Sequence, residues 1–185
     1  MSRRLGVILT ILALLVPATT LAANPVPQPN LAAGLKVFKR SKHSYDNLPT
    51  AAKSFQADVV VSRRVATAVD TKKNQYYVYV TQMKNKTACV VLIQGSGYAP
   101  HCKPESFLFE KGRETVSVAS GLIGGVAQND VKKLVLVGRS KRKVIPLTTD
   151  NGFIYGCPAP TNCAKWVTTV LGYNASGKLV STESV

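Results

Sequence analysis

The stretch QYYVYVTQMKNKTACVVLIQ (residues 75–94) decides the fold class, because it has the pattern of a β-hairpin. Tyr77, Tyr79 and Thr81 would lie on one face of an extended chain, with the residues between them on the other. A polar MKNK segment then leads into TACVVLIQ, a second run rich in branched residues. We therefore expect two antiparallel strands joined by a short polar turn.

The same β signal occurs along the rest of the chain. Further strands are predicted in VVVSRRVATAV, in the two halves of SFLFEKGRETVSVAS, in VKKLVLV, KVIPL and FIYGC, and in KWVTTVLGY and KLVSTES. GSGYAP is expected to break the chain, and Pro146 marks an edge strand or a bulge because it cannot donate to a ladder. Trp166 is the expected large core anchor of this β-rich domain.

One short N-terminal helix is predicted near residues 48–57, capped by Asp46 or Asn47, with Pro49 near its first turn. With about nine or ten short strands, the fold class is mainly β. We expect a single antiparallel β-sandwich or a partly open barrel-like domain that spans residues 34–185.

The first residues have the features of an export signal. Arg3 and Arg4 precede an apolar stretch of about a dozen residues, and small residues follow that suit cleavage after Ala22 or Ala23. A membrane span needs about 20 apolar residues, so a cleaved signal peptide over 1–23 is favoured over an uncleaved anchor. The Pro-rich segment 24–33 is predicted to be an extended spacer. The mature chain is expected to have no membrane span and to be secreted or held in the cell envelope.

Four cysteines, Cys89, Cys102, Cys157 and Cys163, lie in the predicted mature chain and indicate disulfides. Three pairings are possible. The CPAPTNC loop makes Cys157–Cys163 plausible, and Cys89 and Cys102 flank a turn-rich stretch, so they too have the spacing of a local pair. A zinc site is disfavoured because the closely spaced Cys pairs that it normally uses are missing, so we predict no metal site and no cofactor.

The chain is strongly basic, with 24 Lys and Arg against 9 acidic residues and a net charge of +15. Such a balance attracts polyanions, but the charge is spread along the chain, and diffuse charge more often means a solvated surface. The densest group lies around the predicted hairpin 131–147. A speculative anion-binding site there would contain Arg139, Lys141, Arg142, Lys143, Lys132 and Lys133.

No catalytic constellation is recognised in the sequence. GLIGGV (121–126) lacks the ending of a phosphate-binding loop, and a flexible strand or turn is expected instead. Glu105, Glu110 and Glu114 lie beside basic residues and are expected to form surface pairs. Asp130 and Asp150 precede a strand and a turn, where an Asp commonly bonds its own backbone. We therefore predict that the protein is not an enzyme.

The order of several segments resembles a group of exported proteins of actinobacteria, for which no activity is characterised. The segments are LKVFKRSKHSYDNLP, SRRVATA, YYVYVT, ACVVLI with a Gly-rich break and a Cys, GLIGGVAQNDVKKLVLV and TTDNGFIY, over most of residues 35–155. These motifs are structural in character, so the resemblance assigns no catalytic residue. It implies a bacterial protein in the cell envelope or outside the cell.

Together these observations predict a non-enzymatic binding or structural module with a basic surface. Its expected partner is an anionic cell-envelope polymer or the headgroups of lipids, and no specific recognition of nucleic acid is expected. Two alternatives stay open: a cell-envelope hydrolase with an unrecognised site, and a protein-interaction module that uses an exposed strand edge. The ligand, the order of the strands and the oligomeric state do not follow from the sequence.

Overall fold

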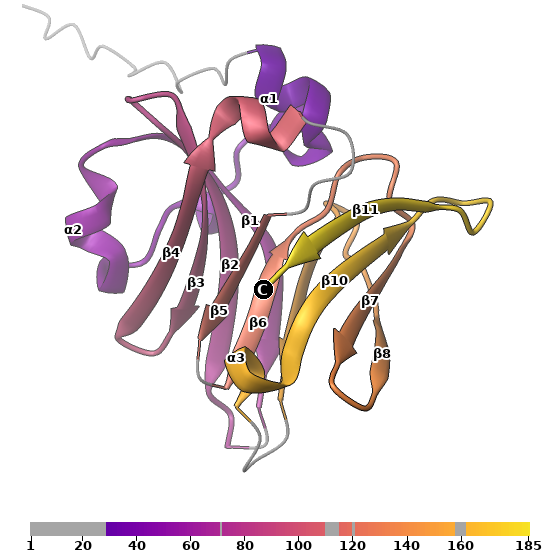
Figure 1. Cartoon of the computed structure of the whole chain (residues 1–185). Coiled ribbons are helices and arrows are strands. Elements are labelled where there is room, and N and C mark those ends of the chain that lie inside the picture. The colour runs from indigo at the N-terminus through magenta and orange to yellow at the C-terminus, as the bar shows by residue number, and fades with distance from the viewer. Residues whose placement is uncertain (1–28, 71, 110–114, 120, 158–161) are drawn as a thin grey trace, which may run out of the picture.

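The hairpin predicted over residues 75–94 is the centre of the first sheet (Figure 1). The structure is a computed structural model that describes residues 29–70, 72–109, 115–119, 121–157 and 162–185. The predicted signal peptide lies outside these residues. The sheet has the order β1-β2-β3-β4 and contains β1 (Val59–Val69), β2 (Gln75–Met83), β3 (Thr87–Gln94) and β4 (Gly97–Pro104).

Two further antiparallel sheets follow in the chain. A three-stranded sheet has the order β5-β6-β9 and contains β5 (Thr115–Ala119), β6 (Leu122–Val126) and β9 (Gly152–Gly156). The terminal sheet has the order β11-β10-β7-β8 and contains β7 (Lys133–Gly138), β8 (Arg142–Ile145), β10 (Val167–Tyr173) and β11 (Leu179–Ser184).

The three-stranded sheet packs against both four-stranded sheets. Along β6, Leu122 belongs to the core shared with the first sheet, whereas Ile123 belongs to the core shared with the terminal sheet. Since neighbouring residues of a strand point to opposite faces, both faces of β6 are buried. A Cβ on Gly124 would lie 2.7 Å from Cγ2 of Val78, so the glycine in GLIGGV permits this close approach of the sheets.

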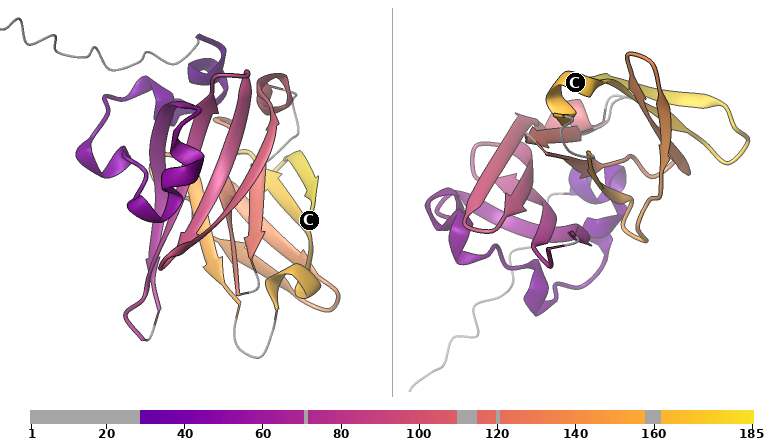
Figure 2. Two further views of the ribbon diagram at one scale, coloured as in Figure 1. Left: turned by 90° about the vertical axis from the view of Figure 1, so that its left-hand side faces the viewer. Right: turned by 90° about the horizontal axis from the view of Figure 1, so that it is seen from below.

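Short helical segments cover the outer face of the first sheet (Figure 2, left). Ala52 and Phe55 of these segments, together with Leu48 just before them, pack against Tyr79 and other apolar residues of this face. Leu31 and Val37 of the earlier segments belong to the core on the opposite face of the sheet. The segments before β1 are α1 (Pro29–Gly34), the 3-10 helices η1 (Lys36–Lys39), η2 (Ser44–Asp46) and η3 (Thr50–Ala52), and α2 (Lys53–Gln56). Two more follow later, η4 (Glu105–Phe109) and α3 (Cys163–Trp166).

The mainly β, antiparallel class is confirmed, but the arrangement differs from a single two-sheet sandwich. The described chain forms three sheets, and none of them closes into a barrel. In place of one helix over 48–57, η3 continues into the single turn of α2. Where the sequence predicts an extended spacer up to residue 33, α1 begins at Pro29 and buries Leu31 completely.

Three local predictions differ from the structure. SFLF (106–109) belongs to the 3-10 helix η4 rather than to a strand, and most of GSGYAP belongs to β4, which pairs with β3. Trp166 ends α3 and is half-buried, so it is not the main core anchor. Phe153 of β9 takes that place, since it is the largest fully buried side chain among the described residues.

Candidate functional site

The predicted basic hairpin is present as β7 and β8, joined by a tight turn. The Gly138 amide donates to the Lys141 carbonyl at 2.9 Å, and β8 is the edge strand that Pro146 indicates. Register pairs Val137 with Arg142 and Leu136 with Lys143. Because Leu136 faces the core, Lys143 lies on that side of the sheet, and Arg142 lies on the outer side.

Two of the six predicted anion-binding residues line one groove on the outer face of the terminal sheet. The groove has a volume of about 300 Å³, and Lys133, Val135, Arg142, Val144 and Tyr173 line it together with Gly177. Lys133 Nζ lies 5.7 Å from the centre of the Tyr173 ring, a cation–π contact that keeps the ammonium group at the groove. We call this surface the terminal-sheet groove.

The groove has a cation towards each end and apolar side chains between them. Val135 and Val144 are register partners, and Arg142 is paired with Val137, which lies four residues from Lys133 along β7. At about 3.4 Å per residue, the backbone positions of the two cations are about 14 Å apart along the strands. Val144 is 56% exposed, so the apolar part of the groove is open to solvent.

The other four predicted residues lie elsewhere. Arg139 and Lys141 are exposed at the hairpin turn, and Lys143 is exposed on the opposite side of β8. The Lys132 Nζ donates to the Asn129 carbonyl at 3.0 Å. The six residues therefore do not form one cluster, and only Lys133 and Arg142 share a described cavity.

The outer face of the terminal sheet is positively charged. Among the described residues of its four strands, Glu183 is the only carboxylate. Glu183 is the register partner of Val170, whose side chain is fully buried in the core, so the carboxylate belongs to the inner side of the sheet. No carboxylate of these strands therefore neutralises Lys133 and Arg142 on the outer face.

Both local disulfides are present. Cys89 of β3 is bonded to Cys102, its register partner on β4, and Cys157 is bonded to Cys163. Paired cysteines of this kind are typical of proteins in an oxidising compartment. They hold the edge strand β4 and the chain before α3 in place, and they leave no thiol for nucleophilic chemistry in this chain.

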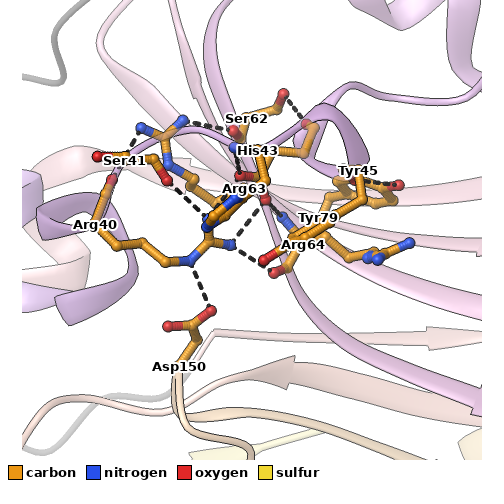
Figure 3. A network of polar contacts seen from close by, with 10 residues as sticks. Arg40, Ser41, His43, Tyr45, Ser62, Arg63, Arg64, Tyr79 and Asp150 are labelled. Carbon is orange, nitrogen blue, oxygen red and sulfur yellow. Dashed lines mark hydrogen bonds and ion pairs between the residues drawn. The ribbon is translucent and has the colours of Figure 1, made fainter.

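A polar network centred on Arg40 joins the N-terminal segments to β1 and to the loop before β9 (Figure 3). The guanidinium group forms a two-pronged ion pair with Asp46, at 2.7 and 2.8 Å, and Nε donates to Asp150 at 2.9 Å. Asp150 is 110 positions from Arg40, so no local pattern in the sequence indicates this contact. The sequence predicts a bond of Asp150 to its own backbone, and the contact with Arg40 is one that this prediction does not include.

Asp46 is saturated with donors and has no exposed surface. One oxygen accepts from Arg40 and the His43 amide, and the other accepts from Arg40 and the Arg64 amide. Burial alone would raise the pKa of the Asp46 carboxyl, but these hydrogen bonds outweigh it and lower the pKa below its ordinary value. Asp46 is the third residue of η2, and its carboxylate accepts from the amide of His43, the residue before that helix. Its predicted role as the cap of the next helix is therefore wrong.

The network is suited to holding the fold together and not to proton transfer. A carboxylate that accepts from two backbone amides and a guanidinium has no lone pair directed at a substrate. The H-bond to Asp46 raises the pKa of Arg40, although burial opposes this, so Arg40 stays charged. We therefore assign Arg40, Asp46 and Asp150 a structural role.

Glu105 is buried, contrary to its expected place in a surface pair. It is 7% exposed, and the Gln82 side-chain amide donates to it at 3.0 Å. Glu110 and Glu114 lie outside the described residues. Within the described chain, no three or more His, Cys, Asp or Glu side chains gather in a way that could hold a metal ion, and no helix has the length and apolar character needed to cross a membrane.

Comparison with known proteins returned no match to a family model, to a curated protein or to a solved structure.

Proposed function

We propose that the protein is an exported, non-enzymatic binding module that holds an anionic polymer of the cell envelope in the terminal-sheet groove. The observation that carries the proposal is the placement of Lys133 and Arg142 in one open groove. The one carboxylate of the four strands, Glu183, lies on the opposite face of the sheet. The net charge of +15 would attract a polyanion over a longer range. The disulfides fit a location outside the cytoplasm.

The shape of the groove favours an extended ligand with repeating charges over a compact one. Two cations about 14 Å apart along the strand direction, with valines between them, match a chain whose anionic groups alternate with less polar units. Tyr173 adds a flat surface on which a sugar or a polyol unit can pack. Phosphate or carboxylate groups on such a polymer would be bound by charge-assisted hydrogen bonds from Arg142 and Lys133.

The test compares two double variants that lose the same charge. Lys133→Ser/Arg142→Ser removes both groove cations, whereas Lys132→Ser/Lys143→Ser removes their sequence neighbours, which lie outside the groove. Binding to immobilised inorganic polyphosphate is measured over a range of salt concentrations. We expect the groove variant to bind about tenfold more weakly, at about 0.7 kcal/mol per cation, and its salt slope to fall by about 2.

The matched control should change much less, because its cations do not share a cavity. Equal losses in the two double variants would mean that total charge, and not the groove, determines binding. Vesicles of anionic phospholipid serve as a second ligand. Stronger binding to the vesicles than to polyphosphate would contradict the proposal of a polymer ligand and would favour lipid headgroups as the ligand.

A further inference from the structure

The Arg64 side chain of β1 is held by two aromatic rings, whereas its backbone belongs to the Arg40 network. Its guanidinium carbon lies 4.4 Å from the centre of the Tyr45 ring and 5.5 Å from the centre of the Tyr77 ring. Tyr45 itself stacks on His43, with ring centres 4.9 Å apart. Figure 3 shows the Arg64 side chain extending past Tyr45 and away from Asp150. Stacking of this kind covers the faces of a guanidinium group, so a ligand can reach it only at the N–H groups that its hydrogen bond to Tyr79 leaves over.

The neighbouring carboxylates do not neutralise Arg64. Asp46 and Asp150 both pair with Arg40, and no ion pair between described residues includes the Arg64 guanidinium. Burial raises the pKa of Tyr79, and the charge of Arg64 and its side-chain hydrogen bond to Tyr79 oppose that rise. This part of the molecule therefore has positive charge that its own carboxylates leave uncompensated.

A second buried cation adds to this imbalance. Arg63 is 5% exposed, and its guanidinium donates to the backbone carbonyls of Ser62 and Arg40, at 2.9 and 3.5 Å. The Arg63 Nε has no hydrogen-bond partner within the described structure. Burial lowers the pKa of Arg63, and the charges of Asp46 and Asp150 offset this only in part.

A hollow of about 200 Å³ lies beside Arg64. Its lining comes from Tyr45, Arg64, Val65, Ala66, Thr67 and Thr148. The hollow is located at a β-bulge, because the register of β1 against β2 shifts between Arg64 and Ala66. The Thr148 hydroxyl donates to the Val65 carbonyl at 2.7 Å and so fixes the bulge. A β-bulge changes the direction of the side chains around it, and bulges often lie next to functional sites.

We propose that this hollow is a second binding site, which takes a single carboxylate or phosphate group of a ligand against the N–H edge of Arg64. The site is independent of the terminal-sheet groove, since no residue lines both cavities. It differs from the groove in kind as well, because one stacked arginine in a small hollow selects a terminal anionic group and not a long polymer. Tyr45 and Tyr77 are positioning residues that keep the guanidinium fork in place.

The test follows the side-chain Nε–H signal of Arg64 by NMR of the 15N-labelled protein. Inorganic phosphate and acetate are titrated separately at constant ionic strength, with chloride as the reference anion. We expect a saturable shift of the Arg64 signal with phosphate, with acetate or with both, and a much smaller shift of the exposed turn residue Arg139. A response to one anion only would identify the group that the site prefers.

Variants separate the two-pronged geometry of the Arg64 guanidinium group from its positive charge. Arg64→Lys keeps the charge but loses the two-pronged geometry, and it should weaken the binding of the preferred anion at least fivefold, as measured by isothermal titration calorimetry. Arg139→Lys is the matched control and should bind as the wild type does. Tyr45→Leu should also weaken binding while Arg64 is kept. An Arg64 shift no larger than that of Arg139, or equal affinity in Arg64→Lys and the wild type, would overturn the proposal.

Discussion

Replacement of Asp46 by Asn tests whether the Arg40 network holds the N-terminal segments on the sheets. Asn keeps the size of the side chain, but its NH2 group would face the donors of Arg40 and of the backbone amides where a carboxylate oxygen now accepts. Breaking a buried pair by removing one partner costs about 3–5 kcal/mol. Arg40 is 21% exposed and keeps Asp150, so we expect the low end, about 3 kcal/mol.

Urea unfolding followed by the fluorescence of Trp166, the one Trp of the chain, measures this loss. With a slope of about 2 kcal/mol per M, a loss of about 3 kcal/mol moves the midpoint down by about 1.5 M. Asp150→Asn is the matched control, because Asp150 is 24% exposed and takes a single bond from Arg40; its expected loss is about 1 kcal/mol. Equal midpoints for the two variants would refute the structural role of the buried pair.

Three further predictions concern stability. The folded-state pKa of Asp46 lies below its ordinary value of 3.8, so the stabilisation by its carboxylate is present above pH 3.8 and is lost as the pH falls through the lowered pKa. The urea midpoints of the wild type and Asp46→Asn should therefore converge in acid. Gly124→Ala should lower the unfolding free energy by about 1–3 kcal/mol in the same urea assay, because the new Cβ would lie 2.7 Å from Val78. Gly121→Ala, with open space around it, should change it by no more than about 0.5 kcal/mol, and similar losses in the two variants would contradict the close packing at Gly124. Replacing the Cys157–Cys163 bridge by two alanines should lower the unfolding free energy by about 2 kcal/mol, as expected for a short closed loop, and an unchanged midpoint would speak against a role in stability.

The hairpin over residues 75–94 and the hairpin of β7 and β8 could be predicted from the sequence because each is determined within about twenty residues. Alternation in residues 75–94, the branched run of β1 and the Pro at the end of β8 all indicate structure locally, and the structure agrees. The order of the sheets could not be predicted in this way. It depends on contacts such as the close packing of Gly124 on Val78, and a strand pattern does not specify its distant neighbours.

The candidate sites show the same limit. Six cations close in sequence suggest one cluster, yet the two-residue period of a strand places Arg142 and Lys143 on opposite faces. The Arg40–Asp150 pair joins residues 110 positions apart, and Glu105 is buried through Gln82 of a strand that precedes it. Polar residues that meet only in the folded state leave no local signal, so the sequence indicates where charge is dense but not which charges share a site.

The placement of the polymer on the terminal sheet is tested most directly by backbone amide NMR during a titration with polyphosphate. The proposed function predicts that the largest shifts map to the strands around the groove, at Lys133, Val135, Arg142, Val144 and Tyr173. Shifts spread evenly over exposed lysines on all sheets, with the groove no different from the rest, would contradict it.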